Sequence, residues 1–152
     1  MSDDGFVLQL SERPGELLVT MAGAISETTT FAVPDVRGRR VIIDPRGVER
    51  LNSMGVRNWI DFIERLQSEA LDVVIRHLPP AMVSQASMIT TFIGNTRVES
   101  FLSPWYCPSC ENTLEQLHGY RDNVPAAISC PRCRAPMELD WDRDAYLAFR
   151  SA

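Results

Sequence analysis

Lysine is absent from this 152-residue chain, and all fifteen of its basic residues are arginine. Twenty carboxylates outnumber them, which leaves a formal net charge of -5. A protein that holds the phosphate backbone of nucleic acid usually carries an excess of positive charge. The composition therefore disfavours general nucleic-acid binding.

Long apolar runs are missing as well. The chain contains no stretch of eighteen apolar residues, so the sequence predicts no transmembrane helix. Its first residues, Met-Ser-Asp-Asp, are acidic and differ from the basic and apolar segments of a secretory signal. We therefore expect a cytoplasmic protein that makes no contact with a membrane.

Cysteine is absent from residues 1–106, and all four cysteines lie between Cys107 and Cys133. The first hundred residues must fold by burial, and an apolar fraction of 45% over the whole chain is sufficient for a core. The remaining segment has few large apolar residues and needs a crosslink or a metal ion. We expect a first domain at residues 1–103 and a small zinc ribbon at residues 104–152.

Hydrophobic periodicity predicts an α/β fold, with a mixed β-sheet covered by helices. A Pro-Gly turn between the first two apolar runs indicates a hairpin, and the third strand is expected to stop at an Asp-Pro step and lead into a loop. Residues 23–40 contain few apolar side chains, and no full helix is expected there. The expected strands are residues 6–10, 16–21, 40–44, 71–75 and 97–102, and the expected helices are residues 55–67 and 80–93.

Two Cys-x-x-Cys motifs, separated by nineteen residues, dominate the second segment. Two thiolates three positions apart in a tight turn can face one ion, and two such turns complete a tetrahedral shell. A closed shell leaves no position for an activated water, so we expect a structural zinc ion. Two disulfides or a redox-active pair are the alternatives, but reduced thiols in a cytoplasm favour metal binding. The expected ligands are Cys107, Cys110, Cys130 and Cys133.

Zinc ribbons often bind nucleic acid, and the net charge of the ribbon segment bears on this possibility. Residues 101–152 carry five arginines and seven carboxylates, and four thiolates around a dication add two further negative charges. These charges repel phosphate, so a nucleic-acid role for the ribbon is disfavoured. We expect its aromatic residues to form its core or to pack on the first domain or on a protein partner. They are Trp105, Tyr106, Trp141, Tyr146 and Phe149.

The segment Asn52-Ser53-Met54-Gly55 leads directly into the helix expected at residues 55–67. Ser53 is predicted to be the N-cap, where its hydroxyl accepts a hydrogen bond from an amide of the first turn. Such a cap stabilises a helix by about 1 kcal/mol.

The same region resembles the loop-to-helix signature of STAS domains, the family of anti-sigma-factor antagonists. In that family an apolar strand ending in Asp and a Gly-Val pair precede Asp-Ser-Ser-Gly at a helix start. This chain has the same order in Val41–Asp44, Gly47-Val48 and Asn52–Gly55. The resemblance covers about residues 5–103. It implies a STAS-like mixed β-sheet and phosphorylation of Ser53 by a partner serine kinase that is itself the anti-sigma factor.

A phosphate at Ser53 suits a switch, because the amides and the dipole of a helix N-terminus tolerate an anion while its charge disrupts a partner interface. Two positions depart from the family pattern, since Asn52 replaces an acidic residue and Met54 replaces a second serine. The segment at residues 26–40 is also too short for the family's usual first helix. These departures favour a binding module derived from a phosphorylation switch.

We therefore expect a non-enzymatic protein-interaction module of bacterial signalling, with an anti-sigma-factor serine kinase or another signalling protein as its partner. One alternative is a zinc-ribbon adaptor that binds nucleic acid or the transcription machinery, and another is a small-ligand sensor. No catalytic triad or phosphate-binding loop supports an enzyme, and His77 and His118 are expected at the surface or at strand ends. The expected partner surface comprises Asn52, Ser53, Met54, Gly55 and Arg57, with the exposed side of the helix at residues 55–67.

Overall fold

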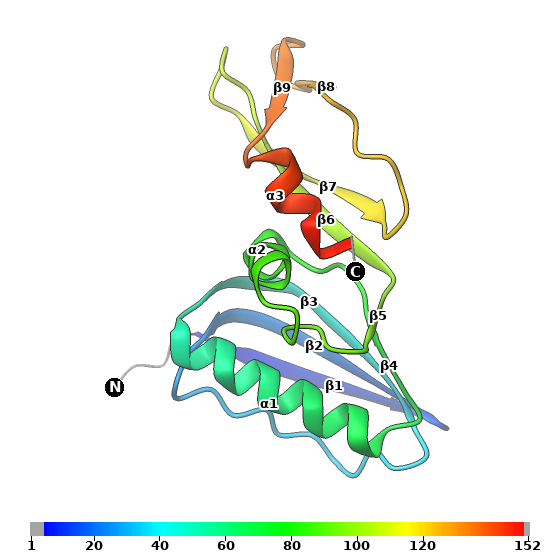
Figure 1. The fold of residues 1–152 in the computed structure, drawn as a ribbon. Coiled ribbons are helices and arrows are strands. Elements are labelled where there is room, and N and C mark those ends of the chain that lie inside the picture. Colours follow the sequence, from blue (N-terminus) through cyan, green and yellow to red (C-terminus); the bar gives the residue numbers. More distant parts are fainter. Residues whose placement is uncertain (1–4, 151–152) are drawn as a thin grey trace.

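A computed structural model describes residues 5–150 and shows two β-sheets and three α-helices within them (Figure 1). The predicted mixed α/β class is confirmed. No helix in this range is both long and apolar enough to cross a lipid bilayer. The elements are β1 (Val7–Arg13), β2 (Glu16–Ile25), β3 (Arg40–Leu51), α1 (Ser53–Glu69), β4 (Asp72–Ile75), α2 (Pro80–Met88), β5 (Arg97–Val98), β6 (Ser100–Tyr106), β7 (Thr113–Gly119), β8 (Ile128–Ser129), β9 (Pro136–Leu139) and α3 (Arg143–Leu147).

The first sheet has the strand order β1-β2-β3-β4-β5. β1 and β2 form the predicted antiparallel hairpin, whereas β2 to β5 run parallel and follow one another in chain order. Connections between parallel strands are right-handed, so sequential order brings every crossover to the same face of the sheet. Helix α1 lies across the sheet, and α2 lies between the two sheets (Figure 1).

Helix α1 contains the predicted helix and extends it by two residues at each end. Its apolar side chains recur at three- and four-residue intervals, so they share one face, which packs on the sheet. Trp59 is completely buried, and its Nε1 donates a 2.8 Å hydrogen bond to the carbonyl of Phe92. The buried residues of this face are Gly55, Trp59, Phe62, Ile63 and Leu66.

Strand β3 does not stop at Asp44-Pro45, so that prediction is wrong. The strand continues to Leu51, and its pairing with β2 shifts register between Thr20 and Ala22. Proline has no N–H for the ladder, and a bulge lets a strand continue past such a residue. The segment expected to be a loop is therefore the second half of a long strand.

Helix α2 ends at Met88 instead of Ile93, which corrects the second helix prediction. Ile89 already has an extended backbone, with φ −124° and ψ 109°. It is followed by two threonines, and β-branched residues lose side-chain freedom in a helix. The carbonyl of Phe92 bonds to Trp59 of α1, so this segment packs on α1 as a series of turns.

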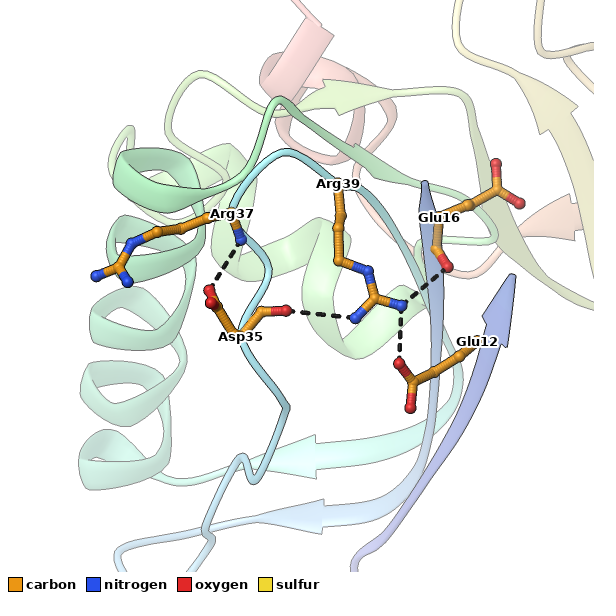
Figure 2. A network of polar contacts seen from close by, with 5 residues as sticks. All are labelled: Glu12, Glu16, Asp35, Arg37 and Arg39. Carbon is orange, nitrogen blue, oxygen red and sulfur yellow. Dashed lines mark hydrogen bonds and ion pairs between the residues drawn. The ribbon is translucent and has the colours of Figure 1, made fainter. Parts of the chain in front are cut away.

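Residues 26–39 form no helix, as predicted, and they are held in place by side chains. Phe31 stacks on Phe62 of α1 with 4.5 Å between the ring centroids. Figure 2 shows how Arg39 fastens the end of the segment, because its Nη2 donates to Glu12 Oε1 at 2.8 Å and its Nη1 donates to the carbonyl of Asp35 at 3.3 Å. The segment thus connects the β1–β2 hairpin to α1.

The second sheet has the order β7-β6-β9-β8, and the domain division expected between residues 103 and 104 falls inside β6. Helix α3 packs on α2, where Ser87 Oγ donates to the carbonyl of Tyr146 at 2.8 Å. Trp105, Tyr146 and Phe149 are buried, as expected for core aromatics, whereas Trp141 is 49% exposed. The buried side chains of both sheets form one continuous core.

Candidate metal centre and loop site

Each Cys-x-x-Cys motif forms the turn of a β-hairpin. The first joins β6 to β7, and the second joins β8 to β9. Strands β6 and β9 pair with each other, and Tyr106 lies opposite Glu138 in this ladder. The pairing brings the two turns to the same end of the second sheet.

The two turns repeat the same backbone geometry. The amide of Glu111 donates to the carbonyl of Cys107, and the amide of Arg134 donates to the carbonyl of Cys130, both at 2.8 Å. Glu111 and Arg134 also occupy the left-handed region, with φ of 64° and 65°. A left-handed residue after the second cysteine closes each turn, so both thiols of a pair point inward.

The four cysteine Sγ atoms lie within 4.8 Å of one another. The Sγ atoms of Cys107 and Cys133 are 3.5 Å apart, and those of Cys110 and Cys130 are 3.6 Å apart. A disulfide bond is about 2.05 Å long, and all four cysteines are free. Thiolates at about 2.3 Å from a tetrahedral zinc lie about 3.8 Å from one another. The cluster therefore has the size of a single coordination shell and can hold one metal ion.

The thiols of the cluster differ in acidity. Burial raises the pKa of Cys130, but hydrogen bonds from the backbone amides of Cys133 and Arg132 outweigh it and bring the pKa to about 6. At Cys110 the backbone amide of Asn112 lowers the pKa, while burial and the neighbouring thiols raise it to about 12. The hydrogen bonds at Cys130 therefore favour its thiolate. Binding of a cation would displace the remaining protons, because only thiolates ligate metals well.

A buried polar chain lies in the same sheet, and sequence reasoning missed it. Trp105 Nε1 donates to Ser103 Oγ at 2.8 Å, and Ser103 Oγ lies 2.6 Å from His118 Nε2. His118 stands near the end of β7 but is only 5% exposed, and burial lowers its pKa. The three residues are spread over β6 and β7, so only the strand register, and no local motif, predicts their meeting.

The start of α1 differs from the prediction in its cap. Asn52 is the N-cap, and its Oδ1 accepts a 2.7 Å hydrogen bond from the amide of Gly55. Its Nδ2 donates to Glu27 Oε1 at 2.8 Å, which connects the cap to the end of β2. Ser53 is the first helical residue, so the prediction that Ser53 caps the helix is wrong.

The five residues of the expected partner surface have two different environments. Asn52, Ser53, Met54 and Arg57 are exposed, and the side chain of Met54 is 50% exposed. Gly55 is buried, because the backbone carbonyl of Ile25 lies where its Cβ would be. The Ser53 hydroxyl makes no hydrogen bond to residues 5–150. The structure thus presents four of the five side chains to solvent and gives Gly55 a packing role.

Comparison of the chain with protein families, with curated proteins and with solved structures found no match. Its function must therefore be argued from its residues and their geometry.

Proposed function

We propose that this chain is a non-enzymatic protein-interaction module of bacterial signalling, with a STAS-like sheet and a C-terminal zinc ribbon. The start of α1 would be its partner surface. The observation that carries the proposal is the division of roles between Asn52 and Ser53. Because Asn52 caps the helix, the Ser53 hydroxyl is exposed and can change without loss of a structural hydrogen bond.

The fold supports the STAS-like interpretation. A β-hairpin and two βα units on a parallel sheet follow the order that the resemblance implies, whereas the irregular crossover at residues 26–39 departs from it. The close approach of Gly55 to Ile25 explains why a glycine stands at this position of the signature. This contact fixes the helix start against the end of β2, so a partner would meet a rigid surface.

Phosphorylation at Ser53 would change this surface more than the fold. The group would add nearly two negative charges beside the free amides of the first helical turn, where an anion is stabilised. Arg57 lies one turn further along α1 and is exposed, so it can pair with the phosphate. The same charges would lie beside the exposed Met54 and repel a partner that buries it.

Zinc is the metal proposed for the cysteine cluster, because four thiolates in a tetrahedral arrangement are typical of structural zinc. Cys107, Cys110, Cys130 and Cys133 would hold it. Asn112 Nδ2 lies 3.7 Å from Cys130 Sγ and would support that ligand from outside the shell. The ion would crosslink the two hairpins of a sheet whose strands β8 and β9 are short.

The test uses the metal-loaded chain and a purified serine kinase of the anti-sigma-factor type from the same genome. We expect mass spectrometry to find phosphate at Ser53 and calorimetry to find a complex that Ser53→Asp abolishes and Ser53→Ala retains. Ser68→Ala, at the other end of α1, is the matched control and should behave as wild type. Equal binding by Ser53→Asp and Ser53→Ala would exclude the switch, and absence of any complex would exclude this partner class.

A further inference from the structure

One face of the first sheet has no element packed on it. The parallel strands β2 to β5 follow one another in chain order, so right-handed crossovers place α1, α2 and residues 26–39 on the opposite face. Parallel sheets are normally covered on both faces. We call the uncovered side the open face; its residues are Glu16, Leu18 and Thr20 of β2, Arg40, Ile42 and Asp44 of β3, Asp72 and Val74 of β4, Arg76 after β4, and Arg97 of β5.

An apolar row crosses the middle of the open face. The strand register places Leu18 beside Ile42 and Ile42 beside Val74. Leu18 and Ile42 are half-buried and lie outside the main core that the helices cover, whereas Val74 is completely buried beneath its neighbours. The accessible apolar surface of this row therefore comes from Leu18 and Ile42, which lie side by side at its centre and favour a protein contact there.

A row of four charges with alternating sign borders the apolar row. Arg40 lies 3.9 Å from Glu16 and 3.7 Å from Asp72, and Arg97 lies 2.8 Å from Asp72. From β2 to β5 the signs are therefore negative, positive, negative and positive. The four side chains remain between 29% and 56% exposed, so they can still meet a second set of charges.

A second charged group borders the apolar row on its other side. Asp44 lies 3.6 Å from Arg76 Nε and 3.0 Å from His77 Nδ1. The Nε atoms of Arg40 and Arg76 make no hydrogen bond to residues 5–150, since their carboxylate neighbours are beyond hydrogen-bond distance. In this group the negative charge belongs to β3 and the positive charge of Arg76 follows β4, the reverse of the order at Arg40 and Asp72.

Read from β5 to β2, the order of signs is the opposite, strand by strand, of the order from β2 to β5. Two copies of the face can therefore pair unlike charges. A two-fold axis parallel to the strands, between β3 and β4, would place β3 over β4 of a second copy and β2 over β5. Arg40 would then meet Asp72 of the second copy, Glu16 would meet Arg97, and Asp44 would meet Arg76. Ile42 would lie opposite Val74 of the second copy. Leu18 would lie opposite the aliphatic part of Arg97, because the register places Arg97 beside Val74 while its guanidinium reaches Asp72. Such a pair would resemble the aligned packing of two sheets about 10 Å apart.

We propose that the open face binds a second copy of this chain in a face-to-face dimer with two-fold symmetry. An isologous interface requires such self-complementarity. Three carboxylates and three arginines on this face make it neutral, whereas the whole chain carries −5, so the face does not select a polyanion or a polycation. The start of α1 belongs to the opposite side of the sheet, so the dimer and the partner surface can be tested separately.

The first test measures the mass of the metal-loaded chain by light scattering and analytical ultracentrifugation. We expect wild type to have twice the chain mass and Ile42→Arg to be a monomer. The dissociation constant of the dimer should rise at least about 30-fold in the variant, because a residue at the centre of the interface is exchanged for a charge. Leu117→Arg is the matched control, since Leu117 is 49% exposed on β7 of the other sheet, and it should remain dimeric. Circular dichroism checks that both variants fold. A monomeric wild type at high concentration, or a dimeric Ile42→Arg, would overturn the proposal.

The second test exchanges charges between copies. Arg40→Glu and Asp72→Arg should each be monomeric, because each puts like charges opposite one another. Their equimolar mixture should form a heterodimer, in which Glu at 40 of one copy meets Arg at 72 of the other and the native Asp72 meets the native Arg40. The double variant should again form a homodimer. A mixture that stays monomeric while wild type dimerises would exclude the proposed axis and overturn the arrangement.

Discussion

The phenolic hydroxyl of Tyr146 donates a 2.6 Å hydrogen bond to the backbone carbonyl of Leu102, and this bond joins α3 to β6. The same segment is fastened to α2, because Ser87 Oγ donates to the carbonyl of Tyr146 and accepts from the amide of Phe149 at 3.1 Å. Phe149 also meets Phe101 edge to face, with 5.3 Å between the ring centroids. The C-terminal helix therefore connects the two sheets through α2.

Tyr146→Phe should destabilise the whole chain. The substitution keeps the buried ring and removes the donor, so the carbonyl of Leu102 loses a partner inside the core. We expect the free energy of unfolding to fall by about 1–3 kcal/mol in urea titrations. Tyr106→Phe is the control, because the half-buried Tyr106 hydroxyl makes no hydrogen bond to the described residues. Equal effects of the two substitutions would contradict a special role for Tyr146.

Gly55→Ala should destabilise the start of α1. A Cβ at this position would collide with the backbone carbonyl of Ile25, which cannot rotate away as a side chain can. We expect a loss of about 1–3 kcal/mol, as for other overpacked sites. The measurement is again urea unfolding, with Ser53→Ala as an exposed neighbour that should change stability little. A Gly55→Ala protein as stable as wild type would show that this close contact is dispensable.

Protonation of His118 should weaken the fold at mildly acidic pH. Burial lowers the pKa of His118 in the folded chain; Asp122 raises it and Arg150 lowers it. The unfolded histidine titrates near pH 6.5, so the unfolded state binds more protons below that pH. The contribution is therefore complete above about pH 6.5 and is lost as the pH falls through the folded pKa.

The measurement compares wild type with His118→Gln in urea titrations from pH 7.5 to 5.5, with bound metal quantified at each pH. We expect wild type to lose more stability than the variant over this range, because the variant lacks the titrating ring. Parallel stability curves for the two proteins would contradict the assignment of this pH dependence to His118.

Loss of a single cysteine should abolish stoichiometric metal binding. We expect one zinc ion per wild-type chain by elemental analysis, and well below one for Cys110→Ser or Cys133→Ser, since a three-thiolate shell is incomplete. Ser109→Ala, in the first turn, should retain the ion. A chelator should loosen the second sheet, which near-ultraviolet circular dichroism detects through Trp105. Full zinc occupancy in Cys133→Ser would show that the four thiols do not act together.

The cysteine cluster could be predicted from sequence because its determinants are local. Each pair of thiols is arranged by a four-residue turn, and only the meeting of the two turns depends on the sheet. Helix α1 was predictable for a similar reason, since the spacing of its apolar residues predicts its buried face. The identity of its cap was not, because Asn and Ser are about equally good N-caps and stand next to each other here.

Features that depend on contacts between distant segments could not be predicted from the sequence pattern. β3 continues past Pro45 because it pairs with β2, and the segment that follows the early end of α2 is held to α1 by the hydrogen bond from Trp59 to the carbonyl of Phe92. The chain Trp105–Ser103–His118 and the charged row of the open face exist only once the strand register is known. Periodicity assigns a residue to a face but does not identify its neighbour on the next strand.

The position of Tyr146 and Phe149 in the chain has a consequence for synthesis. Chains emerge from the ribosome in order and fold as they appear. The first sheet, α1 and α2 are complete before the second pair of cysteines has emerged. Until Tyr146 and Phe149 have been synthesised, the side of α2 that they cover is exposed to solvent. Chaperones can bind this surface, and it can aggregate. Capture of the metal and docking of α3 are therefore expected to follow the folding of the first sheet during synthesis.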